Sequence, residues 1–406
     1  MKITCNYNEL LKDLTDVANV AEDSLSNESV RNIVFVISKG KLTLMGVNAI
    51  VALKRECLPE YYTVDITDDE LSDDKKIVQI KAKELLGFLN SYKTVRRTNV
   101  ESVSFTEDAR NNIVCSVVEV KKREDNDMCP DEELPHYLSS WTFNVAPMQS
   151  LIASAIVYTA PEEGVVSMDS RALCFHTKTL FPLMINAPTM FGKLTVSKDY
   201  FVAFDPSFAT FMHNKANDGS IFEDVCLPYR GVAFLEKFIG VEDNLELAKS
   251  PKHLYIKHKN SEAFISYETN LAICKSYLDI FKKDYAFVID RIMFKDILKR
   301  LSLVNDSVEF IVKREENEIL LKNSKYSQGI SILQSKNLDM IEGDIHFSIT
   351  PNVLNKAIIG SDDEFPNEVF VYYCPLGGGN IGIVFADSTG AWFSVLRVKS
   401  LSRSAL

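Results

Sequence analysis

The apolar and polar positions between Tyr285 and Ser324 predict a short strand, an amphipathic helix and a hairpin. Asp290 stands at the position of a helix N-cap, where its carboxylate can accept an unpaired backbone N–H. After Asn305 the period falls to two, which predicts two strands that turn at Glu315–Glu318. Before it, apolar residues recur at the i, i+3, i+4 and i+7 spacing of one buried helix face: Phe294, Ile297, Leu298 and Leu301.

The same order of elements recurs near the start of the chain. Asn8–Val20 has the spacing of an amphipathic helix, and Asn32–Val47 alternates as two strands that turn at Lys39–Lys41. These segments predict a second copy of the helix and hairpin.

A third copy is predicted in the middle of the chain. Phe143–Thr159 indicates a strand followed by a helix, with Pro147 in the first turn of the helix. Val165–His176 indicates a hairpin around Asp169–Arg171. The apolar stripe of the helix contains Met148, Leu151, Ile152, Ala155 and Ile156.

A second half-motif, a strand that enters a helix and is followed by a hairpin, also occurs three times: Ile77–Lys93, Val225–Gly240 and Ile345–Gly360. Each third of the chain therefore predicts helix, strands, helix, strands. A spacing of roughly 120–150 residues is far longer than that of solenoid repeats, so it indicates triplication of a domain. Three unrelated α+β domains are the alternative.

The fold class predicted is α+β, with three tandem domains that each pack two helices on antiparallel sheet. The charged, proline-containing stretch Lys121–His136 is the best candidate for a domain boundary. The domains are placed at 1–125, 138–283 and 284–406.

Composition changes this picture in two respects. The chain has 406 residues, a net charge of −11 and a pI near 5.2. An acidic protein binds nucleic acid only if basic residues gather on one surface. No run approaches the roughly 18 apolar residues of a membrane span, and no leader segment is apparent, so we expect a cytoplasmic protein that does not enter a membrane.

No constellation of catalytic or metal-binding residues is apparent. The six histidines lack metal-ligand spacing, and the eight cysteines form no CxxC pair and are typical of buried reduced thiols. The glycine cluster Gly377–Gly379 lies between two strands, which favours a hairpin turn over a phosphate cradle. We therefore expect no catalytic residues, no metal and no cofactor, and a protein that is not an enzyme. An enzyme whose site the sequence does not reveal is the alternative.

Basic residues concentrate on or beside the predicted helices, and if all the helices faced one way they would form a candidate nucleic-acid-binding surface. Ordinary solvated helix faces are the alternative for any one of them. The candidates are Lys81, Lys83, Lys93, Arg96, Arg97, Arg230, Lys237, Arg291, Lys295, Lys299, Arg300 and Lys356.

The threefold order on one acidic chain resembles the bacterial and phage DNA sliding clamps, the family of the DNA polymerase III beta subunit. The resemblance covers nearly the whole chain, and it lies in the pattern of predicted elements more than in identical residues. Its most specific segments are MKITCNYNELLKDLTDVANV at the start, the following NIVFVISKGKLTLMGVN, the stretch CLPYRGVAFLEKFIG and the closing strand AWFSVLRV. Ser197–Val202 departs from the segment that bacterial clamps carry there, and about eight residues follow the closing strand, which suggests a divergent, phage-encoded member.

The resemblance implies a non-enzymatic processivity factor. In that family two chains close into a ring of six domains around duplex DNA, without choosing a sequence, and tether the polymerase. It implies a homodimer, with an edge strand of the first domain joined to the third domain of the partner. The matching residues are Ile113, Cys115 and Val117 on the strand Ile113–Val118, and Ile297 and Leu298 on the helix. Burial within their own domain is the alternative for Ile297 and Leu298.

The family also binds short peptides of the DNA polymerase and the clamp loader in an apolar groove between the second and third domains. By position the groove residues are Tyr200, Phe201, Val202, Leu278, Ile280, Phe393, Val395 and Leu396. A monomeric, non-enzymatic DNA-binding scaffold or replication accessory protein is the alternative function.

Overall fold

The computed structural model describes residues 1–22, 31–72, 74–94, 98–121, 136–184, 193–197, 199–205, 208–213, 225–240, 244–269, 285–303, 307–323, 331–334, 345–358 and 365–401. Their contacts divide the chain into two compact units. Unit 1 contains Met1–Met168 and Asn244–Ser266, and unit 2 contains Asp169–Asp243 and Tyr267–Leu406.

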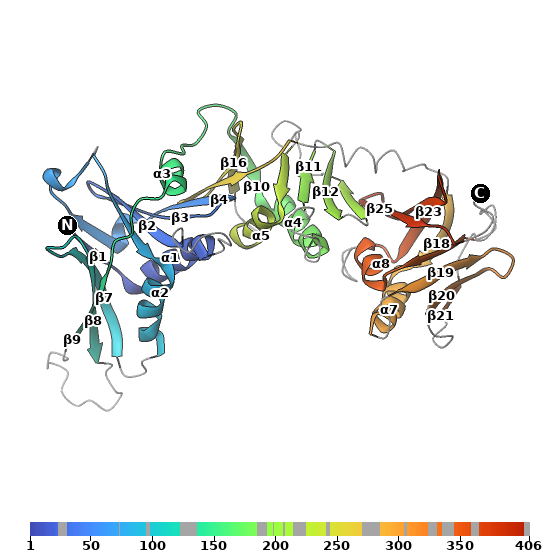
Figure 1. Ribbon diagram of the computed structural model, residues 1–406, viewed down its shortest axis with the longest axis horizontal. Helices are drawn as coiled ribbons and strands as arrows, with labels where there is room; N and C mark the ends of the chain where they lie inside the picture. The colour runs from blue at the N-terminus through green and yellow to red at the C-terminus, as the bar shows by residue number, and fades with distance from the viewer. Residues whose placement is uncertain are drawn as a thin grey trace. The chain divides into compact units, whose positions relative to one another are not determined.

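One order of elements, strand, helix, four strands, helix, three strands, occurs three times (Figure 1). The first repeat, to which β5 (Tyr62–Asp65) is added, contains β1 (Lys2–Cys5), α1 (Tyr7–Glu22), β2 (Asn32–Ser38), β3 (Lys41–Val47), β4 (Val51–Glu56), β6 (Lys76–Lys81), α2 (Ala82–Asn90), β7 (Thr98–Glu107), β8 (Ile113–Lys121) and β9 (His136–Phe143). The predicted triplication of an α+β arrangement is confirmed.

The second and third repeats follow a further helix, α3 (Ser150–Ile156). The second contains β10 (Val166–Asp169), α4 (Ser170–Met184), β11 (Lys193–Val196), β12 (Tyr200–Asp205), β13 (Phe208–His213), β14 (Val225–Pro228), α5 (Tyr229–Phe238), β15 (Asn244–Lys249), β16 (His253–His258) and β17 (Ser261–Ser266). The third contains β18 (Tyr285–Asp290), α7 (Arg291–Ser302), β19 (Val308–Lys313), β20 (Glu318–Asn323), β21 (Ser331–Gln334), β22 (Ile345–Ile349), α8 (Pro351–Ala357), β23 (Glu368–Gly377), β24 (Asn380–Asp387) and β25 (Trp392–Lys399).

Neighbouring repeats share their sheets. The described strands form four antiparallel sheets, in the orders β5-β1-β7-β8-β9, β10-β15-β16-β17-β4-β3-β2-β6, β14-β11-β12-β13-β25-β24-β23-β18 and β21-β20-β19-β22. The two eight-stranded sheets arise because β4 pairs with β17, and β13 pairs with β25. Each of these pairings joins the third strand after the first helix of one repeat to the last strand of the next.

The two helices of each repeat pack together, α1 with α2, α4 with α5 and α7 with α8. The apolar stripe predicted on α7 is buried, and the predicted N-cap is confirmed because the Asp290 carboxylate accepts the Met293 N–H at 2.8 Å. The predicted turns at Gly40 and at Gly378–Gly379 are also confirmed, since these glycines have positive φ angles between paired strands.

Two predictions for the middle of the chain are wrong. The segment Val165–His176 is not a hairpin, because β10 leads directly into α4. The helix predicted to follow a strand within Phe143–Thr159 is short and begins at Ser150, so Pro147 precedes it instead of lying in its first turn. Because α4 packs with α5, α4 rather than α3 is the first helix of the second repeat.

Helix α3 lies on the opposite face of its sheet from α1. The buried side chains of Ile152 and Ala155 join a cluster with Met45, Ala52 and Phe264. Because side chains alternate along a strand, these sheet residues face away from Gly46, whose backbone meets α1. This sheet is therefore covered on both faces, which explains the nearly continuous apolar run of β2.

Strand β9 belongs to the first sheet, because it pairs with β8 from Ile113↔Phe143 to Val120↔His136. The expectation that Phe143 lies in the second domain is therefore wrong. The three domain ranges 1–125, 138–283 and 284–406 otherwise stay a prediction.

Candidate nucleic-acid interface

One of the predicted DNA-binding residues is buried. Arg291 is 0% exposed, and its guanidinium donates hydrogen bonds to the carbonyl oxygens of Phe365 at 2.9 Å and Pro366 at 3.2 Å. A buried guanidinium is stable only with such partners. The prediction that Arg291 contacts DNA is therefore wrong, and its role is to hold the segment before β23 against the start of α7.

Most of the other predicted residues lie at the surface of a helix or its caps. Arg96 and Arg97 lie outside the described residues. The half-buried members of the set are Arg230, Lys295 and Lys356. The exposed members are Lys81, Lys83, Lys93, Lys237, Lys299 and Arg300.

Two exposed basic residues on a helix were not among the predicted DNA-binding residues. Arg171 and Lys178 lie on α4, a helix that the sequence did not indicate. Arg171 also pairs with Asp169, while the structure gives α4 no acidic residue. The i, i+3, i+4 and i+7 spacing of Leu173, His176, Thr177 and Leu180 was the signal that could have revealed this helix.

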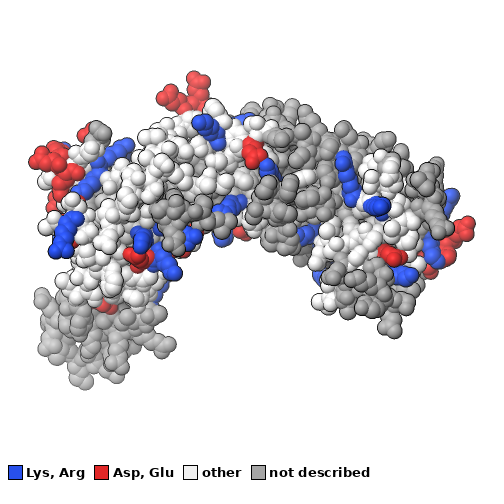
Figure 2. Space-filling view, in the orientation of Figure 1, with Lys and Arg blue, Asp and Glu red and all other residues white. Residues whose placement is uncertain are grey.

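Taken together, the helices α2, α4, α5, α7 and α8 have a net positive charge, opposite in sign to that of the whole chain, although α2 alone is neutral. They contain ten basic and three acidic residues, although the chain has a net charge of −11. On the face shown in Figure 2, acidic side chains gather in a few projecting clusters, while basic side chains are scattered more evenly. The acidic excess therefore resides mainly outside these five helices.

The residues predicted for the dimer interface are buried within the chain. Strand β8 lies between β7 and β9, and Ile113, Cys115 and Val117 are at most 1% exposed. Ile297 and Leu298 belong to the buried stripe of α7. The prediction that these five side chains form the interface is therefore wrong, because β8 is not an edge strand.

Strand β9 provides the free edge of the first sheet instead. Among the described strands it pairs only with β8, and it exposes Leu138 by 72% and Trp141 by 58%. The Trp141 ring lies 6.3 Å from that of Phe88, which links the edge strand to α2. Exposed apolar side chains on an open strand edge are typical of a strand that pairs with another chain.

The eight predicted groove residues divide into three groups. Leu278 and Ile280 lie outside the described residues. Phe201 and Leu396 face the helices, where the Phe201 ring stacks on His176 of α4 at 4.3 Å between centroids.

The other four groove residues lie on the opposite face of the same sheet. The register connects Val202 to Phe211 and Phe211 to Phe393, so these side chains share that face with Tyr200 and Val395. All but Tyr200 are buried. The structure therefore brings together half of the predicted groove, as one apolar aromatic cluster.

The described part of the chain contains little that could support chemistry. It has no group of three or more His, Cys, Asp or Glu residues able to hold a metal ion. Burial raises the pKa of the thiols of Cys5 and Cys115 to about 12, so neither is a thiolate near neutral pH. None of its helices is long and apolar enough to cross a membrane.

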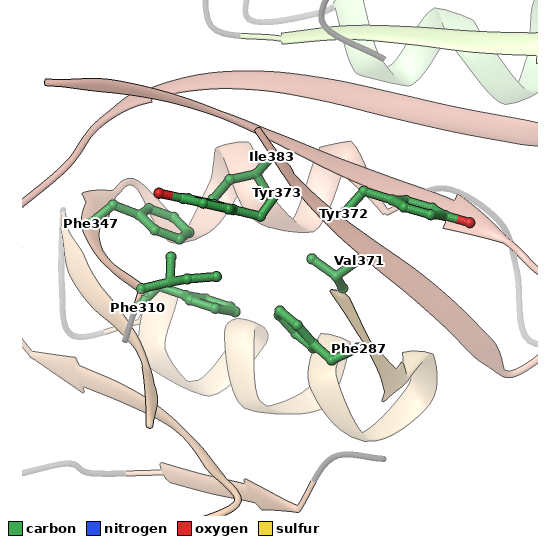
Figure 3. Close-up of a pocket in the computed structure, with 8 residues that line it drawn as sticks. Phe287, Phe310, Phe347, Val371, Tyr372, Tyr373 and Ile383 are labelled. Atoms are coloured by element: carbon green, nitrogen blue, oxygen red, sulfur yellow. The ribbon is translucent and has the colours of Figure 1, made fainter. Parts of the chain in front are cut away.

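A small apolar space lies between the sheets of the third repeat (Figure 3). Phe287, Phe310 and Phe347 line it, and the hydroxyl groups of Tyr372 and Tyr373 point away from its centre. With no polar group directed inward, this space is a packing gap in the core rather than a binding site.

Comparisons with solved structures resolve what fold this arrangement represents. The chain is similar to the DNA polymerase sliding clamp from Pseudomonas aeruginosa, with a TM-score of 0.68 and 14% identity over 99% of this chain and 100% of that chain. The Bacillus subtilis sliding clamp gives 0.67 and 13%, over 99% of both chains, and the Caulobacter crescentus pol III beta gives 0.70 and 14%, over 99% and 100%. This chain has the sliding-clamp fold. No protein-family model and no curated protein sequence matches it.

The full-length coverage means that the clamp fold accounts for the whole chain rather than for one domain of it. Because the identity is 13–14%, the agreement lies in the arrangement of elements, and side chains that carry function need their own argument.

Proposed function

We propose that this chain is a DNA polymerase processivity factor, a sliding clamp in which two copies close into a ring of six domains around duplex DNA. The observation that carries the proposal is the unfinished series of strand pairings. In the pairs β4–β17 and β13–β25, the third strand after the first helix of one repeat pairs with the last strand of the next repeat. By that rule β21 of the third repeat should pair with a strand equivalent to β17 and β25.

The strand equivalent to β17 and β25 is β9, the last strand of the first repeat. Like them, it lies at the end of the row of paired strands that its repeat contributes to a sheet. In the described sheets both β9 and β21 lie at an edge. Pairing β9 of one chain with β21 of another satisfies both edges, and doing so twice closes a symmetric dimer. The proposed dimer interface therefore uses β9 in place of β8, the strand that the sequence analysis had suggested.

The basic helices supply the contact with DNA in this proposal. Lysine and arginine side chains bind backbone phosphates without reading the sequence, and such contacts exchange readily because they are screened and hydrated. A closed ring then prevents escape by topology, so weak contacts suffice for a protein that must slide.

The remaining partners follow from the same role. We propose that the polymerase and the clamp loader bind through short peptides at the joint between the second and third repeats, near the cluster of Tyr200, Val202 and Phe393. The solved clamp from Pseudomonas aeruginosa carries a ligand, and that from Caulobacter crescentus carries a polyethylene glycol at a site described as a beta-motif tethering region. The protein would have no catalytic activity and would act at replicating DNA in the cytoplasm.

Cross-linking the proposed ring on DNA tests whether the protein encircles the duplex, and the experiment needs no clamp loader. The protein is incubated with nicked circular plasmid, closed with a bifunctional amine cross-linker and washed at high salt. We expect cross-linked dimers to stay with the circular plasmid and to be released when a restriction enzyme linearises it.

Two other outcomes would reject the ring. Retention that is unaffected by linearisation would mean that the protein binds along the outside of DNA. A monomer at micromolar concentration in sedimentation, with binding that high salt abolishes on circular plasmid too, would favour a monomeric DNA-binding scaffold.

A further inference from the structure

The helices of unit 2 form one layer on a single sheet. His176 of α4 stacks on Phe201 of β12, and Phe294 of α7 contacts Phe385 of β24 with 6.4 Å between ring centroids. The strand registers put Phe201 and Phe385 on the same face of the eight-stranded sheet. Because α5 packs on α4 and α8 packs on α7, all four helices cover this face.

This helix layer is strongly basic at its surface. Arg291 is buried, and only two acidic residues, Glu236 and Asp296, lie on the four helices. Asp296 is 3.6 Å from Lys299 and neutralises part of the charge of α7. The exposed or half-buried basic residues of the layer are Arg171, Lys178, Arg230, Lys237, Lys295, Lys299, Arg300 and Lys356.

The corresponding helices of unit 1, α1 and α2, show no such excess. Helix α1 carries one lysine, Lys12, against four acidic residues, two of which, Asp13 and Asp16, pair with Arg55 of β4. Helix α2 carries Lys83 and Glu84. Asp13 is buried and neutralised by Arg55, and with the lysines that flank α2 included the remaining charges of this layer only balance: Lys12, Lys81, Lys83 and Lys93 against Glu9, Asp16, Glu22 and Glu84.

We infer that the helix layer of unit 2 makes most of the phosphate contacts with duplex DNA, and that the layer of unit 1 contributes few. The inference rests on the proposed function, since it assigns the proposed contact to one part of each chain. Counterions are released wherever cations meet phosphates, so the affinity and its salt dependence should originate where the net charge is positive. Lys178, on a helix that the sequence did not indicate, becomes a principal contact.

Two variants with equal charge changes test this assignment. The unit 2 variant combines Lys178→Glu, Lys237→Glu, Lys299→Glu and Arg300→Glu. The unit 1 variant combines Lys12→Glu, Lys81→Glu, Lys83→Glu and Lys93→Glu. Because both variants shift the net charge by the same amount, any difference between them reports position rather than overall repulsion.

Binding to a short linear duplex, which can enter a ring through its end, is measured by fluorescence anisotropy over a series of salt concentrations. Each phosphate contact contributes about 0.9 to the slope of log affinity against log salt, so the unit 2 variant should lose about 3 to 4 from the slope if all four side chains bind. We expect the unit 1 variant to lose less than about 1. Circular dichroism and sedimentation verify that both variants are folded and associate like the wild type.

Equal losses of slope in the two variants, or a larger loss in the unit 1 variant, would overturn the inference. A second measurement, Glu9→Gln combined with Glu22→Gln, should leave the slope unchanged, and an increased slope would mean that α1 faces the duplex. These results are separable from the plasmid experiment, because encirclement can hold while the contacts are evenly shared. If wild-type retention does not depend on plasmid topology, the ring fails whichever unit binds.

Discussion

Gly46 sets the distance between α1 and the sheet of unit 1. A Cβ built at this position would lie 2.1 Å from the carbonyl oxygen of Val17, a separation that no relaxed structure permits. We therefore expect Gly46→Ala to push α1 away from β3 and to lower the free energy of unfolding by about 2–3 kcal/mol. Urea denaturation followed by circular dichroism measures this loss.

Gly87 of α2 provides the matched control for Gly46→Ala. A Cβ at Gly87 has no neighbour within 4 Å, and alanine is favoured over glycine inside a helix. Gly87→Ala should raise the free energy of unfolding by about 0.5–1 kcal/mol. If both alanines were tolerated alike, α1 would not approach β3 as closely as described.

Lys54 closes the C-terminal end of α3. Its ammonium group donates to the carbonyl oxygen of Ile156 at 2.9 Å and to that of Tyr158, and it lies 5.3 Å from the centre of the Phe264 ring. Burial lowers the pKa of Lys54 to about 8, although Glu262 opposes the shift. The folded protein therefore releases this proton at a lower pH than the unfolded chain does.

The sign of the pH dependence follows from proton binding. Between about pH 8 and the ordinary lysine pKa of 10.5, the unfolded chain binds more protons at this site than the folded one. The free energy of unfolding of the wild type should therefore rise with pH in this range, relative to that of Lys54→Met. Denaturation at a series of pH values measures the difference. A difference that falls with pH would contradict the burial of Lys54.

Arg291 illustrates what the sequence could not reveal about a single residue. Its position at the start of a charged helix gave no sign of burial, and the N-cap beside it was predicted correctly. The carbonyl groups that stabilise its guanidinium belong to Phe365 and Pro366, more than seventy residues away. Local spacing carries no information about such distant partners.

At the scale of elements, predictions succeeded where the period was regular. The stripes of α1 and α7 and the hairpins β2–β3, β16–β17 and β23–β24 were all indicated by spacing and turn residues. Helix α4 was missed because Asp169–Arg171 resembles a turn and Pro182 lies within the helix, where proline usually weakens it. Tertiary packing under the buried Leu173 and Leu180 overrides that local preference.

Helix α3 is too short to be stable alone, so its position must come from the surface it covers. Ile152 is fully buried in the cluster with Met45 and Phe264. Ile152→Ala should lower the free energy of unfolding by about 2–4 kcal/mol, because it leaves a cavity under the helix. Chemical denaturation measures the change.

Val157, directly after α3, is the control for Ile152→Ala because it is 72% exposed. Val157→Ala should change the free energy of unfolding by less than about 0.5 kcal/mol. Equal effects of the two substitutions would mean that α3 does not rest on this face of the sheet.

At the scale of the whole molecule, the sequence predicted three repeats but not how they join. The charged segment between β8 and β9 hid the last strand of the first repeat, so β8 was taken for the edge. Pairing between strands that are far apart in the chain, such as β4 with β17, leaves no periodic signal. The edge that another chain would meet could therefore be identified only from the sheets.

Association of two chains is the decisive property of the whole molecule, and β9 is where it can be broken. If β9 pairs with β21 of a second copy, the exposed Leu138 and Trp141 are covered in the dimer. Leu138→Glu or Trp141→Glu would then bury a charge without a partner, which is costly enough to weaken association at least 100-fold. Leu138→Glu is the cleaner variant, because Trp141 also contacts Phe88.

Analytical ultracentrifugation at micromolar concentration should give twice the 45.8 kDa chain mass for the wild type and the chain mass for the β9 variants. Leu58→Glu, at a residue of unit 1 that is 43% exposed, introduces the same charge away from β9 and should leave the dimer intact. If Leu138→Glu sediments as a dimer, the interface lies elsewhere. If Leu138→Glu and Leu58→Glu dissociate the dimer to the same extent, the effect comes from the net charge of the chain. Loss of the dimer only in the β9 variants would show that the strand pairing which joins the repeats within a chain also joins one chain to the next.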